Sequence, residues 1–122
     1  SKEYVESTLC RLSCLGPSKV VLTGVAFDGR QVGSASYDRS TDEISYALSD
    51  TVDGYFHGTG DVFASALLGA YMNGLSLAKS ARIAVDYTHG CIVRTKEAGT
   101  DLRYGVDFEH GIPDLLRQTG II

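Results

Sequence analysis

The sequence predicts an α/β fold made of one short apolar strand, a hairpin and packed helices. Three observations support this prediction. An apolar, β-branched run occupies residues 19–23, two alternating segments follow at 31–37 and 43–48, and helical patterns lie before and after these strands. With 122 residues, the chain has the length of one domain or part of one.

The N-terminal segment, residues 2–15, places apolar side chains at helical spacing and ends at a Gly-Pro pair. Cys10 and Cys14 lie four residues apart on this helix and are predicted to be small residues in the core or half-buried at its edge. A metal or redox pair is the weaker alternative, because no second ligand pair lies nearby. The run at residues 19–23 is typical of a strand covered on both faces, as in a parallel sheet.

The next two segments alternate polar and apolar residues on either side of a polar break, which predicts an antiparallel hairpin. A polar loop at residues 49–57 leads to a helix of small residues that ends at Asn73 and Gly74. Ser76 is expected to cap a second helix running to about Arg94. Residues 95–104 are predicted to form a polar loop, and Pro113 to open a short last helix.

The composition excludes several function classes. A net charge of −4 argues against nucleic acid as the main partner, because phosphate backbones require basic surfaces. Three cysteines, an odd number, favour a reducing, cytoplasmic setting over a disulfide framework. The longest uncharged run, residues 62–78, is too short and too broken for a membrane span.

The strongest functional signal is the sequence G-T-G-D at Gly58, Thr59, Gly60 and Asp61, directly before the helix of small residues. One interpretation is a tight turn with an acid at the start of a core helix. A dinucleotide fingerprint fits formally, but no clean strand runs into Gly58 and no acid closes a second strand. The third interpretation is phosphoryl transfer, in which backbone amides hold phosphate and Asp61 accepts the hydroxyl proton.

Two residues at the end of the apolar strand strengthen the third interpretation. Thr23 and Gly24 offer a hydroxyl and a small residue where ligand sites of α/β proteins usually form.

The run F-H-G-T-G-D-V-F-A-S-A-L-L-G-A closely resembles the G-[TA]-G-D signature of the ribokinase (PfkB-like) superfamily, and more finely its pyridoxal/pyridoxamine (vitamin B6) kinase branch. The resemblance extends in order to V-V-L-T-G, I-S-Y-A-L, V-D-G-Y-F-H and I-V-R-T-K-E. It implies that residues 1–122 are a single partial domain, the C-terminal half of a ribokinase-like three-layer α/β fold with a parallel strand, an antiparallel hairpin and packed helices.

This resemblance implies ATP-dependent phosphorylation of the 5′-hydroxymethyl group of pyridoxal, pyridoxine or pyridoxamine, with Mg²⁺ and sometimes K⁺ at the ATP phosphates. Asp61 resembles the family's catalytic base, and the glycine turn before it the anion hole. The nucleotide-binding residues that it implies are Thr23, Gly24, Val52, Thr59, Gly60 and Ile92.

Two alternatives stay open. The first is a kinase of the same superfamily for another hydroxymethyl compound, either the thiamin pyrimidine precursor or a sugar. The second is a non-catalytic module that binds nucleotide or oligomerises.

The resemblance places most of the vitamin-ring pocket, the lid and the acids near Mg²⁺ in an N-terminal half that this chain lacks. We therefore expect weak nucleotide binding, no useful turnover and self-association from this chain alone. His57, His89 and His110 have no metal-ligand spacing, and no metal ligand is predicted. Tyr55 and Phe56 could flank a ligand, but packing under the loop is the expectation.

Overall fold

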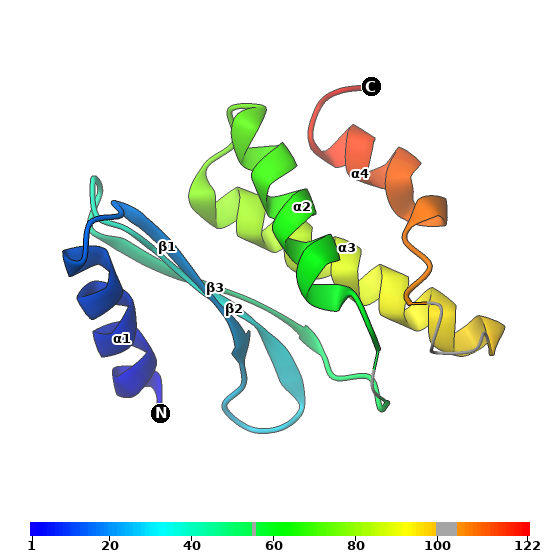
Figure 1. Ribbon diagram of the computed structural model, residues 1–122, viewed down its shortest axis with the longest axis horizontal. Coiled ribbons are helices and arrows are strands. Elements are labelled where there is room, and N and C mark those ends of the chain that lie inside the picture. The colour runs from blue at the N-terminus through cyan, green and yellow to red at the C-terminus, as the bar shows by residue number, and fades with distance from the viewer. Residues whose placement is uncertain (55, 100–104) are drawn as a thin grey trace.

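The chain forms three layers in a computed structural model that describes residues 1–54, 56–99 and 105–122 (Figure 1). Helix α1 (Lys2–Cys14) covers one face of a three-stranded sheet, and α2 (Thr59–Met72) and α3 (Leu77–Ala98) cover the other. The 3-10 turn η2 (Glu109–Gly111) and α4 (Ile112–Gln118) pack against α3. The N-terminus lies beside α1 and the C-terminus beside α4, on opposite sides of the molecule (Figure 1).

The sheet consists of β1 (Lys19–Val25), β2 (Gln31–Asp38) and β3 (Glu43–Asp50) in the order β1-β2-β3, and both pairings are antiparallel. The predicted hairpin is confirmed as β2–β3. The prediction of a parallel strand is wrong for the described chain, because β1 pairs with β2 alone and in the antiparallel sense. An apolar run indicates that both faces of a strand are covered, but it carries no information about the direction of its neighbour.

Side-chain alternation divides the sheet between two cores. Val20 and Leu22 of β1 pack with Ala35 and Tyr37 of β2 around Leu9 of α1. On the opposite face, Val21 and Ala47 contact the helical layer, whose core residues are Phe63, Ala66, Ala81, Ala84 and Val85. Both faces of the predicted apolar strand are therefore covered by helices.

The two N-terminal thiols point away from the core. The buried residues of α1 are Leu9 and Ser13, one helical turn apart, and Cys10 and Cys14 each follow one of them and are exposed. The prediction that Cys10 and Cys14 are core or half-buried residues is therefore wrong. Cys91 on α3, in contrast, is buried.

Helix α3 begins as predicted, because the Ser76 side chain accepts a hydrogen bond of 3.1 Å from the Lys79 amide. It continues past the predicted end to Ala98 and is capped by Gly99 in a left-handed conformation. The prediction of a loop is thus wrong for residues 95–98, and residues 100–104 lie outside the described chain. The Thr95 hydroxyl donates to the Cys91 carbonyl and accepts from the Asp107 amide, both at 2.7 Å, which secures this extra turn.

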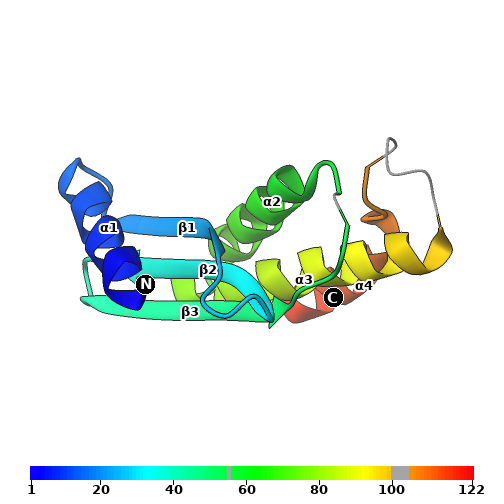
Figure 2. The ribbon, with the colours of Figure 1, turned by 90° about the horizontal axis from the view of Figure 1, so that it is seen from below.

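Both β1 and β3 run antiparallel to β2, so their carboxyl ends lie at the same end of the sheet. Helix α3 extends beyond this end, as Figure 2 shows. The guanidinium of Arg82 ties the two layers together by donating to the Leu48 carbonyl at 2.6 Å. None of the helices among the described residues combines the length and apolar character that crossing a bilayer requires.

Candidate functional site

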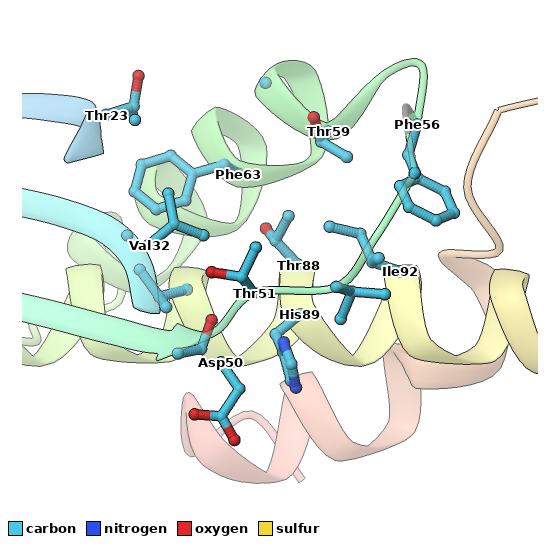
Figure 3. Close-up of a pocket in the computed structure, with 17 residues that line it drawn as sticks. Thr23, Val32, Asp50, Thr51, Phe56, Thr59, Phe63, Thr88, His89 and Ile92 are labelled. Atoms are coloured by element: carbon cyan, nitrogen blue, oxygen red, sulfur yellow. The ribbon is translucent and has the colours of Figure 1, made fainter. Parts of the chain in front are cut away.

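A cavity of about 440 Å³ opens where the carboxyl ends of β1 and β3 meet the start of α2 and the middle of α3 (Figure 3). Its volume lies within the range of roughly 300–1,000 Å³ that is typical of small-molecule sites. All six residues that the sequence suggested for nucleotide binding line this cavity: Thr23, Gly24, Val52, Thr59, Gly60 and Ile92. Gly58 and Asp61 are not among its lining residues.

The start of α2 has a glycine in a left-handed conformation and no capping side chain. Gly58 precedes the helix with a φ of 84°, a left-handed conformation that favours glycine, and no side chain caps the helix. The Val62 amide donates to the Gly58 carbonyl at 3.0 Å and so closes the first turn. The amides at a helix start have no intrahelical acceptor and lie at the positive end of the helix dipole. They can therefore bind phosphate oxygens.

Asp61 is the third residue of α2 and is exposed to solvent. Its carboxylate has no hydrogen bond or ion pair with any other part of the described chain. It lies next to Gly60, which lines the cavity, but not in the cavity wall itself. An exposed carboxylate therefore lies one residue from the cavity wall.

The wall of the cavity formed by β1 is shaped by an irregularity of that strand. The register of β1 against β2 shifts between Thr23 and Val25, and Gly24 between them has a φ of 69°. Bulges of this kind turn side chains away from the regular alternation and are common beside binding sites. Here Thr23 and Gly24 reach the cavity although the rest of β1 packs between helices.

Several lining residues were not predicted from the sequence as site residues. They are Asp50 at the end of β3, Thr51 after it, Phe63 of α2, and Val85, Thr88 and His89 of α3. Phe56 also lines the cavity, as the alternative to packing under its loop had suggested, and Tyr55 lies outside the described residues. For the lining residues of α3, the sequence did contain a signal in the helical spacing of its residues. Val85, His89 and Ile92 follow one another at helical spacing, so the stripe that contains the predicted Ile92 also contains His89.

A second cluster of ionisable groups lies elsewhere on α3. Burial raises the pKa of the Cys91 thiol, and burial together with its contact with Cys91 raises the pKa of Tyr87 to about 12. The Arg94 guanidinium donates to the Asp107 carbonyl at 3.2 Å and to the Cys91 sulfur at 3.4 Å. None of these residues lines the cavity described above, and their contacts join α3 to the segment before α4.

Comparison with known proteins first defines the class: the chain is a domain of the ribokinase superfamily. The family model for phosphomethylpyrimidine kinase matches residues 1–105, and the chain belongs to this family. The resemblance that the G-T-G-D sequence indicated is thereby confirmed at the level of the superfamily.

Solved structures agree with this assignment. A putative phosphomethylpyrimidine kinase from Bacteroides thetaiotaomicron is 26% identical, with a TM-score of 0.89 over 94% of this chain and 40% of its own. A second crystal form of that protein, with pyridoxal, has a TM-score of 0.86 at 26% identity, over 94% of this chain and 41% of its own. Pyridoxal kinase from Lactobacillus plantarum is 25% identical, with a TM-score of 0.82 over 93% of this chain and 41% of its own.

The chain thus spans about 40% of the length of the first of these structures. No curated protein matches the chain.

Proposed function

We propose that the chain supplies the nucleotide cavity and the catalytic base of an ATP-dependent kinase that phosphorylates the 5′-hydroxymethyl group of pyridoxal, pyridoxine or pyridoxamine. One observation is the main support for this proposal. The six residues suggested for nucleotide binding surround one cavity, and the acid suggested as the base is exposed beside it. These residues come from β1, the segment after β3, α2 and α3, so their meeting depends on the whole fold.

The cavity suits the two chemically different ends of ATP. Val52 and Ile92 give an apolar border for a flat base, whereas Thr59 and Gly60 present the helix start to the phosphates. Thr23 adds a hydroxyl from the end of β1, and Figure 3 shows it at the same upper border of the cavity as Thr59. In this proposal the phosphates of the nucleotide lie toward α2 and its base lies toward α3.

In the proposed reaction, the carboxylate of Asp61 accepts the proton of the substrate hydroxymethyl group. The hydroxyl oxygen forms a bond to the γ-phosphorus, and the bond from that phosphorus to the oxygen bridging it to the β-phosphate breaks. The first-turn amides of α2 stabilise the charge on the phosphate oxygens during this transfer. An acid at an anion-binding helix start thus has a chemical task.

Mg²⁺ is expected to accompany ATP, and it would neutralise negative charge on the phosphates. Among the described residues, no three His, Cys, Asp or Glu side chains are grouped so that they could hold a metal ion. The part of the chain that the structure describes therefore does not fit a protein-held metal, and no step of the reaction is assigned to one.

A second substrate is favoured by a specific observation, the match to the phosphomethylpyrimidine kinase family. The Bacteroides relative carries that description, and one of its crystal forms is described with pyridoxal. Pyridoxal and hydroxymethylpyrimidine, the thiamin pyrimidine precursor, both present a hydroxymethyl group on a six-membered nitrogen heteroaromatic ring. The thiamin pyrimidine precursor is therefore the alternative substrate for the same reaction.

The test is a phosphate-transfer assay on the complete gene product with ATP and a substrate panel. The panel contains pyridoxal, pyridoxine, pyridoxamine, hydroxymethylpyrimidine and ribose. Phosphorylation of the three B6 compounds with the highest kcat/KM is the expected result. A preference for hydroxymethylpyrimidine would move the assignment to the alternative substrate. ATP binding without transfer to any compound would contradict the kinase function and leave a nucleotide-binding module.

A further inference from the structure

Thr88 of α3 brings to the cavity a hydroxyl that the proposed reaction does not use. Figure 3 shows its side chain on the side of α3 that faces α2, in the same space as Thr59 and Ile92. The carboxylate of Asp50 and the imidazole of His89, in contrast, are directed away from this space in the same view. The Thr88 hydroxyl is therefore a polar group within reach of a ligand in the cavity.

The proton of this hydroxyl is already used inside the helix. Oγ1 of Thr88 donates to the Ala84 carbonyl at 2.8 Å, one turn earlier in α3. A threonine hydroxyl has one proton and two lone pairs, so this oxygen can accept a further hydrogen bond but can donate one only by giving up its bond to Ala84. A ligand that fills the cavity excludes water from the oxygen, and a donor on the ligand is then needed to keep it paired.

The position of Thr88 indicates which part of a nucleotide meets this acceptor. Thr88 lies one helical turn before Ile92, and Thr51 directly precedes Val52, so a threonine stands beside each of the two residues assigned to the base. The Thr51 hydroxyl donates to the Gly29 carbonyl at 3.3 Å, so its proton is used as well. Thr51 is exposed and can pair with solvent, whereas Thr88 is half-buried. The two hydroxyls thus present acceptors to the base and no free donor.

Purine bases differ in the group at position 6. Adenine has an amine, which donates hydrogen bonds, whereas guanine and hypoxanthine have a carbonyl oxygen, which accepts them. An acceptor on the protein pairs with the amine and leaves the carbonyl oxygen without a donor.

We infer that Oγ1 of Thr88 accepts a hydrogen bond from the amine of adenine and makes the cavity selective for ATP over nucleotides with a carbonyl at position 6. This inference rests on the proposed nucleotide binding. It assigns Thr88 a role in the choice of nucleotide, separate from the proton transfer at Asp61. Thr88 is thus a specificity-determining residue.

The experiment measures nucleotide affinity by titration calorimetry on the complete gene product, with ATP and inosine triphosphate. The two nucleotides have the same ribose and phosphates, so the ratio of their affinities reports on the base. The unchanged protein should bind ATP about fivefold more tightly, the effect of one hydrogen bond between neutral groups. Thr88→Val replaces the hydroxyl with a methyl group of similar size and should bring this ratio close to one. Thr88→Ser keeps the hydroxyl and should keep the ratio.

Thr8→Val is the matched control. The Thr8 hydroxyl donates to the Tyr4 carbonyl at 2.8 Å in the same arrangement, but Thr8 belongs to α1 and does not line the cavity. The preference for ATP should therefore persist in Thr8→Val.

Three results would overturn the inference and leave the proposed function intact. The first is equal affinity of the unchanged protein for ATP and inosine triphosphate, and the second is an undiminished preference in Thr88→Val. The third is a ratio near one in Thr88→Ser as well, since the methyl group and not the hydroxyl of Thr88 would then set the choice. Absence of binding by either nucleotide would overturn the proposed function as well.

Discussion

Gly33 of β2 lies so close to β3 that a Cβ atom built on it would collide with the carbonyl oxygen of Ala47. The same atom would lie 2.9 Å from the Leu48 Cα, so backbone atoms surround this position. Gly33 also lines the cavity, beside the end of the sheet where Thr23 and Asp50 lie. The close approach of two strands at this point therefore shapes the floor of the site.

The first prediction concerns this contact. Gly33→Ala should lower the free energy of unfolding by about 2 kcal/mol or more, because relief of the collision requires the strands to separate. Urea unfolding followed by circular dichroism measures this change. Gly69→Ala is the control: a Cβ there meets nothing within 4 Å, and alanine in a helix is favoured by about 1 kcal/mol over glycine. Equal stability of the two variants would contradict the close approach.

Alanine substitutions at the two glycines of the G-T-G-D turn should have different effects, one on stability and the other on ATP binding. Gly58 has a φ of 84°, so Gly58→Ala should cost about 1–2 kcal/mol of stability through backbone strain. Gly60 is a helical residue with open space around its Cα, so Gly60→Ala should fold normally. Because Gly60 lines the cavity, the added methyl group should weaken ATP binding about tenfold by disturbing a hydrogen bond to phosphate. Urea unfolding and calorimetry on both variants separate these effects, and a strongly destabilised Gly60→Ala would count against this geometry.

The third prediction concerns the thiols. Cys10 and Cys14 are exposed, whereas Cys91 is buried and its burial raises the pKa of the thiol, which disfavours the reactive thiolate. A thiol reagent such as Ellman's reagent should therefore modify two thiols in the native chain at neutral pH and the third only after denaturation. Rapid modification of a third thiol in the native state would show that α3 is packed differently.

The fourth prediction concerns pH. The hydrogen bond to His110 is the largest cause that lowers the pKa of Asp107, with Nδ1 of the imidazole 2.8 Å from Oδ2 of Asp107. A carboxyl whose folded pKa lies below its unfolded pKa stabilises the fold above the unfolded pKa, and this contribution is lost as the pH falls through the folded pKa. His110→Ala should therefore raise the pKa of Asp107 toward the ordinary aspartate value, as measured by NMR titration of the side-chain carboxyl. An unchanged pKa of Asp107 in His110→Ala would rule out this contact.

The sequence predicted the local elements well, because their signals are local. The β2–β3 hairpin follows from alternation around a polar break, and the Ser76 cap from a hydroxyl before an apolar period. The direction of β1 could not be predicted in this way, since its pairing is set by a neighbouring strand. Thr95 was assigned to a loop because it is polar. Its buried hydroxyl forms hydrogen bonds with the Cys91 carbonyl and the Asp107 amide, and these bonds keep Thr95 within α3.

The site was only partly predictable, for a related reason. The glycine turn before Asp61 is contiguous in sequence and could be recognised as a motif. Asp50 belongs to a different part of the chain and has no motif around it. It lies at the border of the cavity because β1 and β3 end on the same side of the sheet, which is a property of the fold.

The central claim is that Asp61 is the base for transfer of phosphate to a hydroxymethyl group. Its most direct test is the steady-state rate of pyridoxal phosphorylation by the complete gene product carrying Asp61→Asn, with Asp53→Asn as the control for loss of charge. We expect Asp61→Asn to lower kcat by about 10²- to 10⁴-fold while ATP affinity and unfolding temperature are retained, and we expect Asp53→Asn to change kcat little. Turnover by Asp61→Asn at the rate of the unchanged enzyme would contradict the claim.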